Sequence, residues 1–242
     1  MGKRGKVVVI IAASVLVFAA AAAIAGPAIY SDYFVEPAAK VPELSASDSK
    51  LSTTAAGPLD PAAFAGEWSV GEGSYAGYRV NEVLNGTDVT VTGRTDQVSG
   101  SLTAQGQTVT QATFSVDVAS IATDNSSRDA YFRENVARAT AHPTATFTLA
   151  EPLTIDSVPS SGEVTEHTLT GDLTLSGVTQ PVSVTVQMRA FAADEGAKFG
   201  TVEIAGQIPI TFADFEMTAP HLGFVSVEPT GIIEFSLALE RP

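Results

Sequence analysis

The sequence of 242 residues predicts an all-β domain of antiparallel strands with one short helix, preceded by an apolar N-terminal segment. Three observations support this fold class. Apolar and polar side chains alternate with a period of two through many short stretches, turns rich in Gly, Asn or Asp separate these stretches, and only residues 126–139 combine Arg, Glu and Ala in a helix-like composition. Such a sheet closes into a barrel or packs as a sandwich, and alternation alone leaves both open.

The first 29 residues predict a membrane anchor. Residues 7–29 contain no charged side chain, and residues 1–6 carry three basic side chains and no acidic one. As a helix the apolar run would be ~34 Å long, enough for the ~30 Å core of a bilayer. The basic flank predicts a cytoplasmic N-terminus, a single-pass helix in the cell membrane and a domain on the extracytoplasmic side. A cleaved signal peptide is the alternative, because Ala23-Ile24-Ala25 has the form of a cleavage site, but the uninterrupted length favours the anchor.

Composition then limits the domain and its partners. The chain has no cysteine, which excludes disulfides, thiolate metal sites, thiol nucleophiles and a lipidated cysteine. Beyond residue 6 there are 10 basic and 27 acidic residues, a net charge of −17 that repels nucleic acid and anionic membrane surfaces. Residues 30–65 are rich in Ala, Ser, Pro and Thr and predict a disordered tether, and residues 66–242 predict one folded domain.

The stretch from Leu169 to Val182 predicts a β-hairpin. Leucines at 169, 173 and 175 alternate with polar residues, and valines alternate again after the turn. Gly177 would supply a positive φ at that turn. Glycines also occur in the inward phase of several strands, at Gly100, Gly171 and Gly206, where they either leave room in a barrel lumen or mark bends.

We find no chemistry of catalysis or cofactor binding in the sequence. No nucleophile elbow, Ser-x-x-Lys pair or phosphate-binding glycine loop is present. The three histidines, His142, His167 and His221, lie far apart and lack metal-ligand spacing. We therefore expect no enzyme, no cofactor and no metal site.

Four short segments in register resemble the YceI-like lipid-binding family. They are Ser120-Ile121-Ala122-Thr123-Asp124 with Arg128-Asp129, then His142-Pro143-Thr144-Ala145-Thr146-Phe147, then Leu169 to Val182, and finally Ile210-Thr211-Phe212-Ala213-Asp214-Phe215. Two departures are present: Ala213 replaces a basic or polar residue, and the segment Gly73 to Val83 lacks the histidines that many members carry there.

The resemblance implies an eight-stranded antiparallel barrel, lipocalin-like in shape, with an apolar cavity for a long-chain lipid and no catalysis. The ligand expected is a polyprenyl phosphate or an isoprenoid quinone, carried or sequestered; a homodimer is left open. A β-sandwich scaffold or adhesion module of the cell envelope is the main rival, and an enzyme with acidic residues in the lumen is a third. Nine residues in the apolar phase of their strands are the candidates for the cavity lining: Phe114, Val116, Phe147, Leu173, Val184, Ile204, Ile208, Phe212 and Phe235.

Three polar residues are candidates for contact with a lipid head group. Tyr78 and Arg79 lie where the family's histidines are missing, although a cross-strand pair on the barrel wall would also explain them. Arg128 opens the helical stretch, where an ion pair with Asp129 would pin the helix over a barrel end. Its planar guanidinium would instead suit a phosphate at the cavity entrance, but we favour the structural role.

Overall fold

The computed structural model describes residues 37–44, 59–84, 86–156, 159–192, 199–223 and 225–242. The predicted anchor at residues 7–29 and most of the predicted tether lie outside this range. No helix in the described part of the chain is long and apolar enough to cross a membrane.

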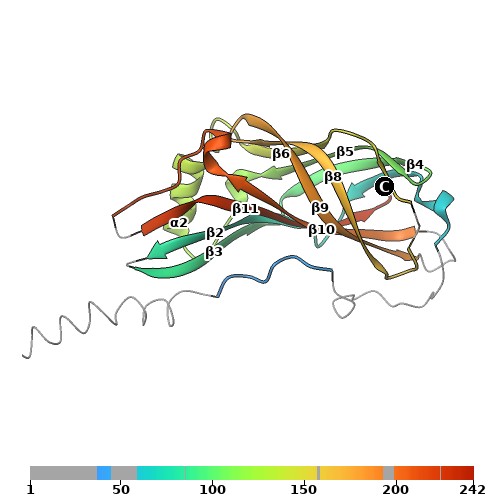
Figure 1. Cartoon of the computed structure of the whole chain (residues 1–242), viewed down its shortest axis with the longest axis horizontal. Coiled ribbons are helices and arrows are strands. Elements are labelled where there is room, and N and C mark those ends of the chain that lie inside the picture. The colour runs from blue at the N-terminus through green and yellow to red at the C-terminus, as the bar shows by residue number, and fades with distance from the viewer. Residues whose placement is uncertain (1–36, 45–58, 85, 157–158, 193–198, 224) are drawn as a thin grey trace, which may run out of the picture.

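The described domain is built from antiparallel strands, short helical turns and one α-helix (Figure 1). In chain order they are η1 (Pro61–Phe64), β1 (Gly66–Val70), β2 (Tyr75–Leu84), β3 (Thr87–Thr95), β4 (Val98–Gln105), β5 (Thr108–Asp117), η2 (Val118–Ser120), α2 (Ser126–Tyr131), η3 (Phe132–Val136), β6 (Thr144–Leu149), β7 (Leu153–Thr154), β8 (Val164–Leu175), β9 (Val178–Ala192), β10 (Phe199–Thr211), η4 (Phe212–Phe215) and β11 (Val225–Glu240).

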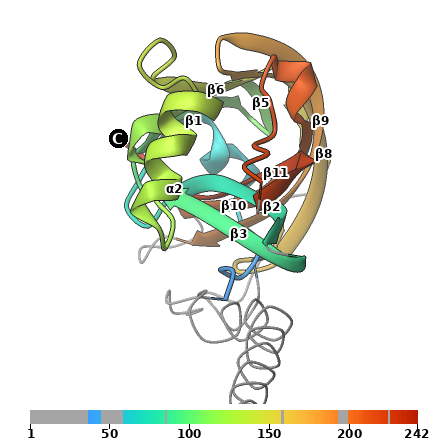
Figure 2. The ribbon, with the colours of Figure 1, turned by 90° about the vertical axis from the view of Figure 1, so that its left-hand side faces the viewer.

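Eight of these strands form a closed antiparallel barrel. Their order around the ring is β1-β4-β5-β6-β8-β9-β10-β11, and the ring closes because β11 also pairs with β1 at Ser69↔Glu240 and Val70↔Leu239. The long strand β11 continues past β1 and pairs with the β2–β3 hairpin, as the view along the barrel shows (Figure 2). The predicted eight-stranded barrel is confirmed, and the sandwich alternative is wrong.

The predicted hairpin is β8–β9. Its pairing runs without a register shift from Val164↔Arg189 to Leu175↔Val178. The turn has a positive φ at both central residues, 52° at Ser176 and 84° at Gly177, which is the twist-compatible geometry of a two-residue hairpin. Gly177 therefore has the conformation that the sequence predicts.

Two of the inward glycines make room for phenylalanine rings. A Cβ at Gly171 would lie 2.2 Å from the ring of Phe147, and one at Gly206 would lie 2.6 Å from the ring of Phe235. Both contacts are shorter than a carbon–carbon approach allows, so no larger residue fits without moving the ring. These glycines accommodate the aromatic side chains of the neighbouring strands.

The helical stretch lies at one end of the barrel's long axis and η1 at the other (Figure 1). Asn125 caps α2, its side chain accepting hydrogen bonds from the N–H groups of Ser127 and Arg128. After Tyr131 the chain continues as a short π-helix, η3. The hairpin turn holds the end of this unit, since Arg138 donates to Ser176 Oγ (2.9 Å) and Ser176 Oγ donates to the Ala137 carbonyl (3.1 Å).

Candidate functional site: an apolar cavity with a polar end

The barrel encloses an apolar cavity of about 250 Å³. Its lining comes from the inward side chains of the barrel strands, together with the β2 strand and the α2–η3 unit. All nine residues predicted to face the lumen do line it: Phe114, Val116, Phe147, Leu173, Val184, Ile204, Ile208, Phe212 and Phe235. Their contact with a ligand stays a prediction.

Side chains such as Trp68 at the η1 end of the barrel are more completely buried than large inward side chains in its middle. At the η1 end, Trp68 and Leu239 have no exposed surface, and Trp68 Nε1 donates to the Phe64 carbonyl at 2.9 Å. In the middle, Phe114, Phe147 and Ile204 point inward and yet are only half-buried. A close-packed core buries inward side chains of this size, so their remaining exposed surface marks the cavity.

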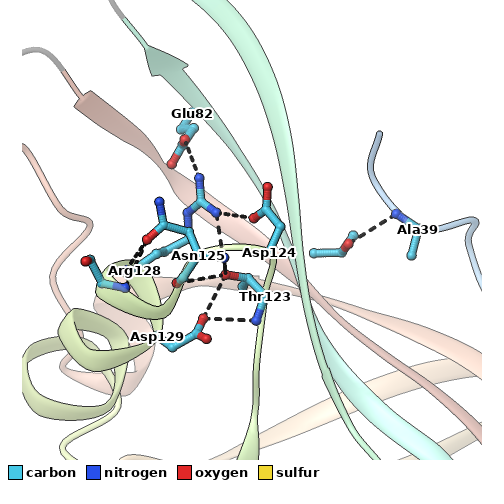
Figure 3. Close-up of polar contacts among 9 residues, drawn as sticks. Ala39, Glu82, Thr123, Asp124, Asn125, Arg128 and Asp129 are labelled. Atoms are coloured by element: carbon cyan, nitrogen blue, oxygen red, sulfur yellow. Dashed lines mark hydrogen bonds and ion pairs between the residues drawn. The ribbon is translucent and has the colours of Figure 1, made fainter. Parts of the chain in front are cut away.

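A cluster of charged side chains borders the cavity at the α2 end (Figure 3). Arg128 Nη1 lies 2.6 Å from Asp124 Oδ1, and Arg128 Nη2 lies 3.4 Å from Glu82 Oε1. Glu82 is on β2 and the other two residues are on α2 and its N-terminal loop, so the cluster joins the helix to the barrel wall. We call Glu82, Asp124 and Arg128 the inner cluster. One cation faces two carboxylates, which gives the cluster an excess of negative charge.

The prediction of an ion pair between Arg128 and Asp129 is wrong, because Arg128 pairs with Asp124 and Glu82 instead. The buried carboxylate of Asp129 accepts hydrogen bonds from the N–H (2.9 Å) and the Oγ1 hydroxyl (2.7 Å) of Thr123. Consecutive helical residues point in different directions, so Arg128 reaches the wall while Asp129 faces back to the loop. Arg128 therefore joins the helix to the barrel wall, whereas Asp129 joins it to its own N-terminal loop.

Tyr78 lines the cavity beside the inner cluster, with its ring centroid 4.7 Å from that of Phe132. Burial raises the pKa of the Tyr78 phenol well above its ordinary value of 10.0; Arg128 opposes this shift, and Asp129, Glu82 and Asp124 add to it. The phenol therefore stays protonated at physiological pH. A protonated phenol in an apolar cavity can donate a hydrogen bond to a carbonyl of a ligand.

Arg79, the third predicted head-group residue, lies on the outer wall of the barrel. Strand neighbours point to opposite faces, and here Tyr78 and Val80 line the cavity while Arg79 pairs with Glu234 on the outside.

The sequence analysis did not identify Glu82 as a site residue, although a signal was available: Glu82 shares the inward phase of Tyr78 and Val80. An acidic residue in an apolar phase is unusual and marks a polar site.

His167 also lines the cavity, and its Nε2 lies 3.0 Å from Thr165 Oγ1. Burial lowers the pKa of the His167 imidazole below its ordinary value of 6.5, and Asp156 partly opposes this. Among the described residues, no group of three or more His, Asp or Glu side chains is placed to hold a metal ion.

A closed β-barrel with an apolar cavity and a polar group at one end has the architecture of barrels that can hold one small ligand. Residues 68–239 match the YceI-like domain, which is most of the chain. The protein belongs to the YceI-like family. A comparison with curated proteins gives no match.

Solved structures similar to this chain come from several bacteria. A polyisoprenoid binding domain from Saccharophagus degradans, implicated in plant cell wall breakdown, has a TM-score of 0.54 and 18% identity, covering 72% of this chain and 98% of that chain. Burkholderia cenocepacia BcnA has a TM-score of 0.48 and 20% identity, and the match covers 66% of this chain and 95% of that chain. A Campylobacter jejuni YCEI protein has a TM-score of 0.46 and 21% identity, and the match covers 61% of this chain and 83% of that chain.

The four segments of the family resemblance have identifiable places in this fold. The first forms the loop before α2 and supplies Arg128 and Asp129 of that helix, and the second leads into β6, where Phe147 lines the cavity. The third is the β8–β9 hairpin, and the fourth is the end of β10 with η4. In that last segment Gln180 Nε2 donates to the Asp214 carbonyl at 2.7 Å, which ties η4 to β9. The shared residues therefore build the barrel and its α2 end.

Proposed function

We propose that the barrel binds a long-chain isoprenoid lipid in its cavity and carries or sequesters it at the extracytoplasmic face of the cell membrane, to which the N-terminal segment anchors the chain. The observation that supports this most strongly is the hollow middle of the barrel, where large apolar side chains face the cavity without filling it. The fold shared with a polyisoprenoid binding domain from Saccharophagus degradans agrees with this ligand class.

The energetic reason for such a cavity is the cost of exposing a hydrocarbon chain to water. Each CH₂ group moved out of water contributes about 0.8 kcal/mol, so a lipid of many isoprene units needs a continuous apolar lining. Closing the sheet into a barrel supplies that lining and leaves no unpaired strand edge within the ring. No reaction is required of the site.

The inner cluster favours a neutral head group over a phosphorylated one. The guanidinium of Arg128 already faces two carboxylates, Glu82 and Asp124. A phosphate placed there would meet two negative charges at short range for one positive charge, which is unfavourable in a partly buried site. The protonated phenol of Tyr78 can donate to a carbonyl oxygen, so of the two ligands considered we propose the isoprenoid quinone.

The ligand is tested by mass spectrometry of lipid that co-purifies with the protein, combined with substitution of the wall. Ile204→Trp should fill the cavity and abolish lipid retention while the barrel still melts cooperatively. Thr113→Trp is the matched control, because Thr113 is exposed on the outer face of β5 beside the cavity residue Phe114. In a solid core, overpacking would instead lower stability by about 1–3 kcal/mol. Such a loss at Ile204, with no lipid bound by the parent protein, would contradict the cavity and favour a scaffold or adhesion role for the barrel.

The anchor is tested by sequencing the N-terminus of the protein extracted from native membranes. An uncleaved chain in the membrane fraction supports the proposal. A mature chain that begins at Gly26 would contradict it and would leave a secreted domain without an anchor.

A further inference from the structure

The described part of the tether, residues 37–44, lies extended along the outer wall of the barrel (blue in Figure 1). The N–H of Ala39 donates to Thr92 Oγ1 on β3 at 3.1 Å (Figure 3), and the N–H of Leu44 donates to Gln187 Oε1 on β9 at 2.8 Å. Strands β2, β11 and β10 lie between β3 and β9. The five residue steps from Ala39 to Leu44 span ~17 Å when extended, and the four strand spacings from β3 to β9 span ~19 Å. Because the two lengths are similar, this segment crosses the strands at a steep angle. We call it the strap.

Beneath the strap lies a carboxylate with no exposed surface. Ile233 and Phe235 line the cavity, so Glu234 between them points outward, and yet its side chain is 0% exposed. Arg79 Nε lies 3.0 Å from Glu234 Oε2, and Arg94 Nη2 lies 2.6 Å from Glu234 Oε1. We call Arg79, Arg94 and Glu234 the outer cluster. It holds two cations for one anion.

The surplus guanidinium N–H groups of the outer cluster bind the strap's backbone. Arg79 Nη2 donates to the Ala39 carbonyl at 2.5 Å, and Arg94 Nη2 donates to the carbonyl of the next residue, Lys40. With the N–H of Ala39 bound by Thr92, three polar groups of the strap backbone, all on Ala39 and Lys40, meet side chains of the wall. Each of these contacts is to a main-chain group, so the site recognises an extended backbone.

The outer cluster is organised for this contact. A carboxylate removed from water costs several kcal/mol unless charged partners compensate it, and here both of its oxygens are paired with arginine. The planar guanidinium has more donors than one carboxylate oxygen uses, and the pairing with Glu234 fixes its orientation. The remaining donors are therefore held in place before the strap arrives, which lowers the entropy cost of binding it.

We propose that the outer cluster, with Thr92 and Gln187, is a docking site for the strap of the same chain, and that docking sets how far the barrel extends from the membrane. This second part rests on the anchor of the proposed function. Seven residues separate the predicted anchor from Pro37 and can span at most ~25 Å. With the strap released, 29 residues separate the anchor from Leu59 and can span ~100 Å. A docked strap keeps the barrel close to its lipid source, and a released one lets it reach away.

Trypsin cleavage after Lys40 in the full-length protein tests the docking site. Lys40 is exposed, but its carbonyl is held by Arg94, and a protease must bind the segment released from the wall. Thr92→Val removes the acceptor of the Ala39 N–H at nearly constant volume and should speed the cut about three- to tenfold, the effect of one hydrogen bond. Thr90→Val is the control, because Thr90 lies on the same strand and bonds to Asn81 rather than to the strap.

Three measurements keep this test decisive. The barrel's melting temperature should stay unchanged in Thr92→Val, which separates release of the strap from unfolding. Equal cleavage rates in the parent, Thr92→Val and Thr90→Val would overturn the docking site. Protection of Lys40 that appears only at concentrations where the protein dimerises would also overturn the proposal, because a second copy's strap would then occupy the site.

The effect on reach is tested in lipid nanodiscs. The chain has no cysteine, so Gln111→Cys, at an exposed position on β5, allows a single fluorophore whose energy transfer to a labelled lipid reports distance. Thr92→Val combined with Arg94→Lys should lower the transfer efficiency, and Thr90→Val should leave it unchanged. Unchanged transfer in the double variant would overturn the control of reach. Absence of the chain from the membrane fraction would contradict the anchor itself, while the cleavage result would still decide the docking site.

Discussion

The inner and outer clusters place the same chemical groups on opposite faces of one wall, in inverse ratio. The inner cluster has one arginine for two carboxylates, and the outer cluster has two arginines for one. An excess of guanidinium leaves N–H donors free to bind neutral carbonyl groups, whereas an excess of carboxylate leaves acceptors that repel anions. The difference supports the two proposals that the outer site binds a peptide backbone and that the inner site takes a neutral ligand.

The largest effect is expected from Glu234→Ala. The substitution removes the anion that compensates Arg79 and Arg94 beneath the strap, and breaking a buried ion pair from one side costs about 3 kcal/mol. Chemical denaturation should show this loss in the free energy of unfolding. Glu228→Ala is the control on the same strand, at an exposed position where a change within about 0.5 kcal/mol is expected. Equal effects of the two substitutions would contradict the special role of the outer cluster.

A smaller loss is expected from Arg128→Ala. The substitution leaves the buried Glu82 without its cation and detaches the helix from the wall, at a cost of about 1–2 kcal/mol. We expect the melting temperature to fall, and quinone binding to weaken only in proportion to the lost stability. Unchanged stability together with a selective loss of polyprenyl phosphate binding would show that Arg128 is instead a head-group residue.

Glu82→Gln tests the charge ratio of the inner cluster directly. The amide keeps the shape of the side chain and removes one of the two negative charges that face Arg128. We expect the affinity for a polyprenyl phosphate to rise up to about tenfold relative to the quinone, because a tenfold change corresponds to about 1.4 kcal/mol of charge repulsion. Side-by-side binding titrations of the two ligands measure this ratio. A ratio equal to that of the parent protein would remove the argument for a neutral head group.

The sequence predicted the barrel wall better than either cluster. Period-two alternation reports which side chains face inward, and for that reason all nine predicted lining residues do line the cavity. The clusters depend on contacts between distant segments, such as Arg79 with Glu234, which alternation does not encode. No pattern in the sequence predicted that the strap contacts the barrel, because the wall binds its backbone, and the composition of the segment predicted only a tether.

The smallest effect is expected from His167, a half-buried ring that belongs to neither cluster and tests how much a single such group contributes to the acid response. In the described part of the chain its ring contacts the neutral Thr165 hydroxyl, and burial lowers its pKa below 6.5. A lowered pKa means that the folded state prefers the neutral ring. Its contribution is therefore complete above pH 6.5 and declines as the pH falls through that value. Melting temperatures at about pH 7.5 and 5.5 should show a smaller acid-induced drop for His167→Gln than for the parent protein. Identical drops in both proteins would mean that other groups govern the acid response.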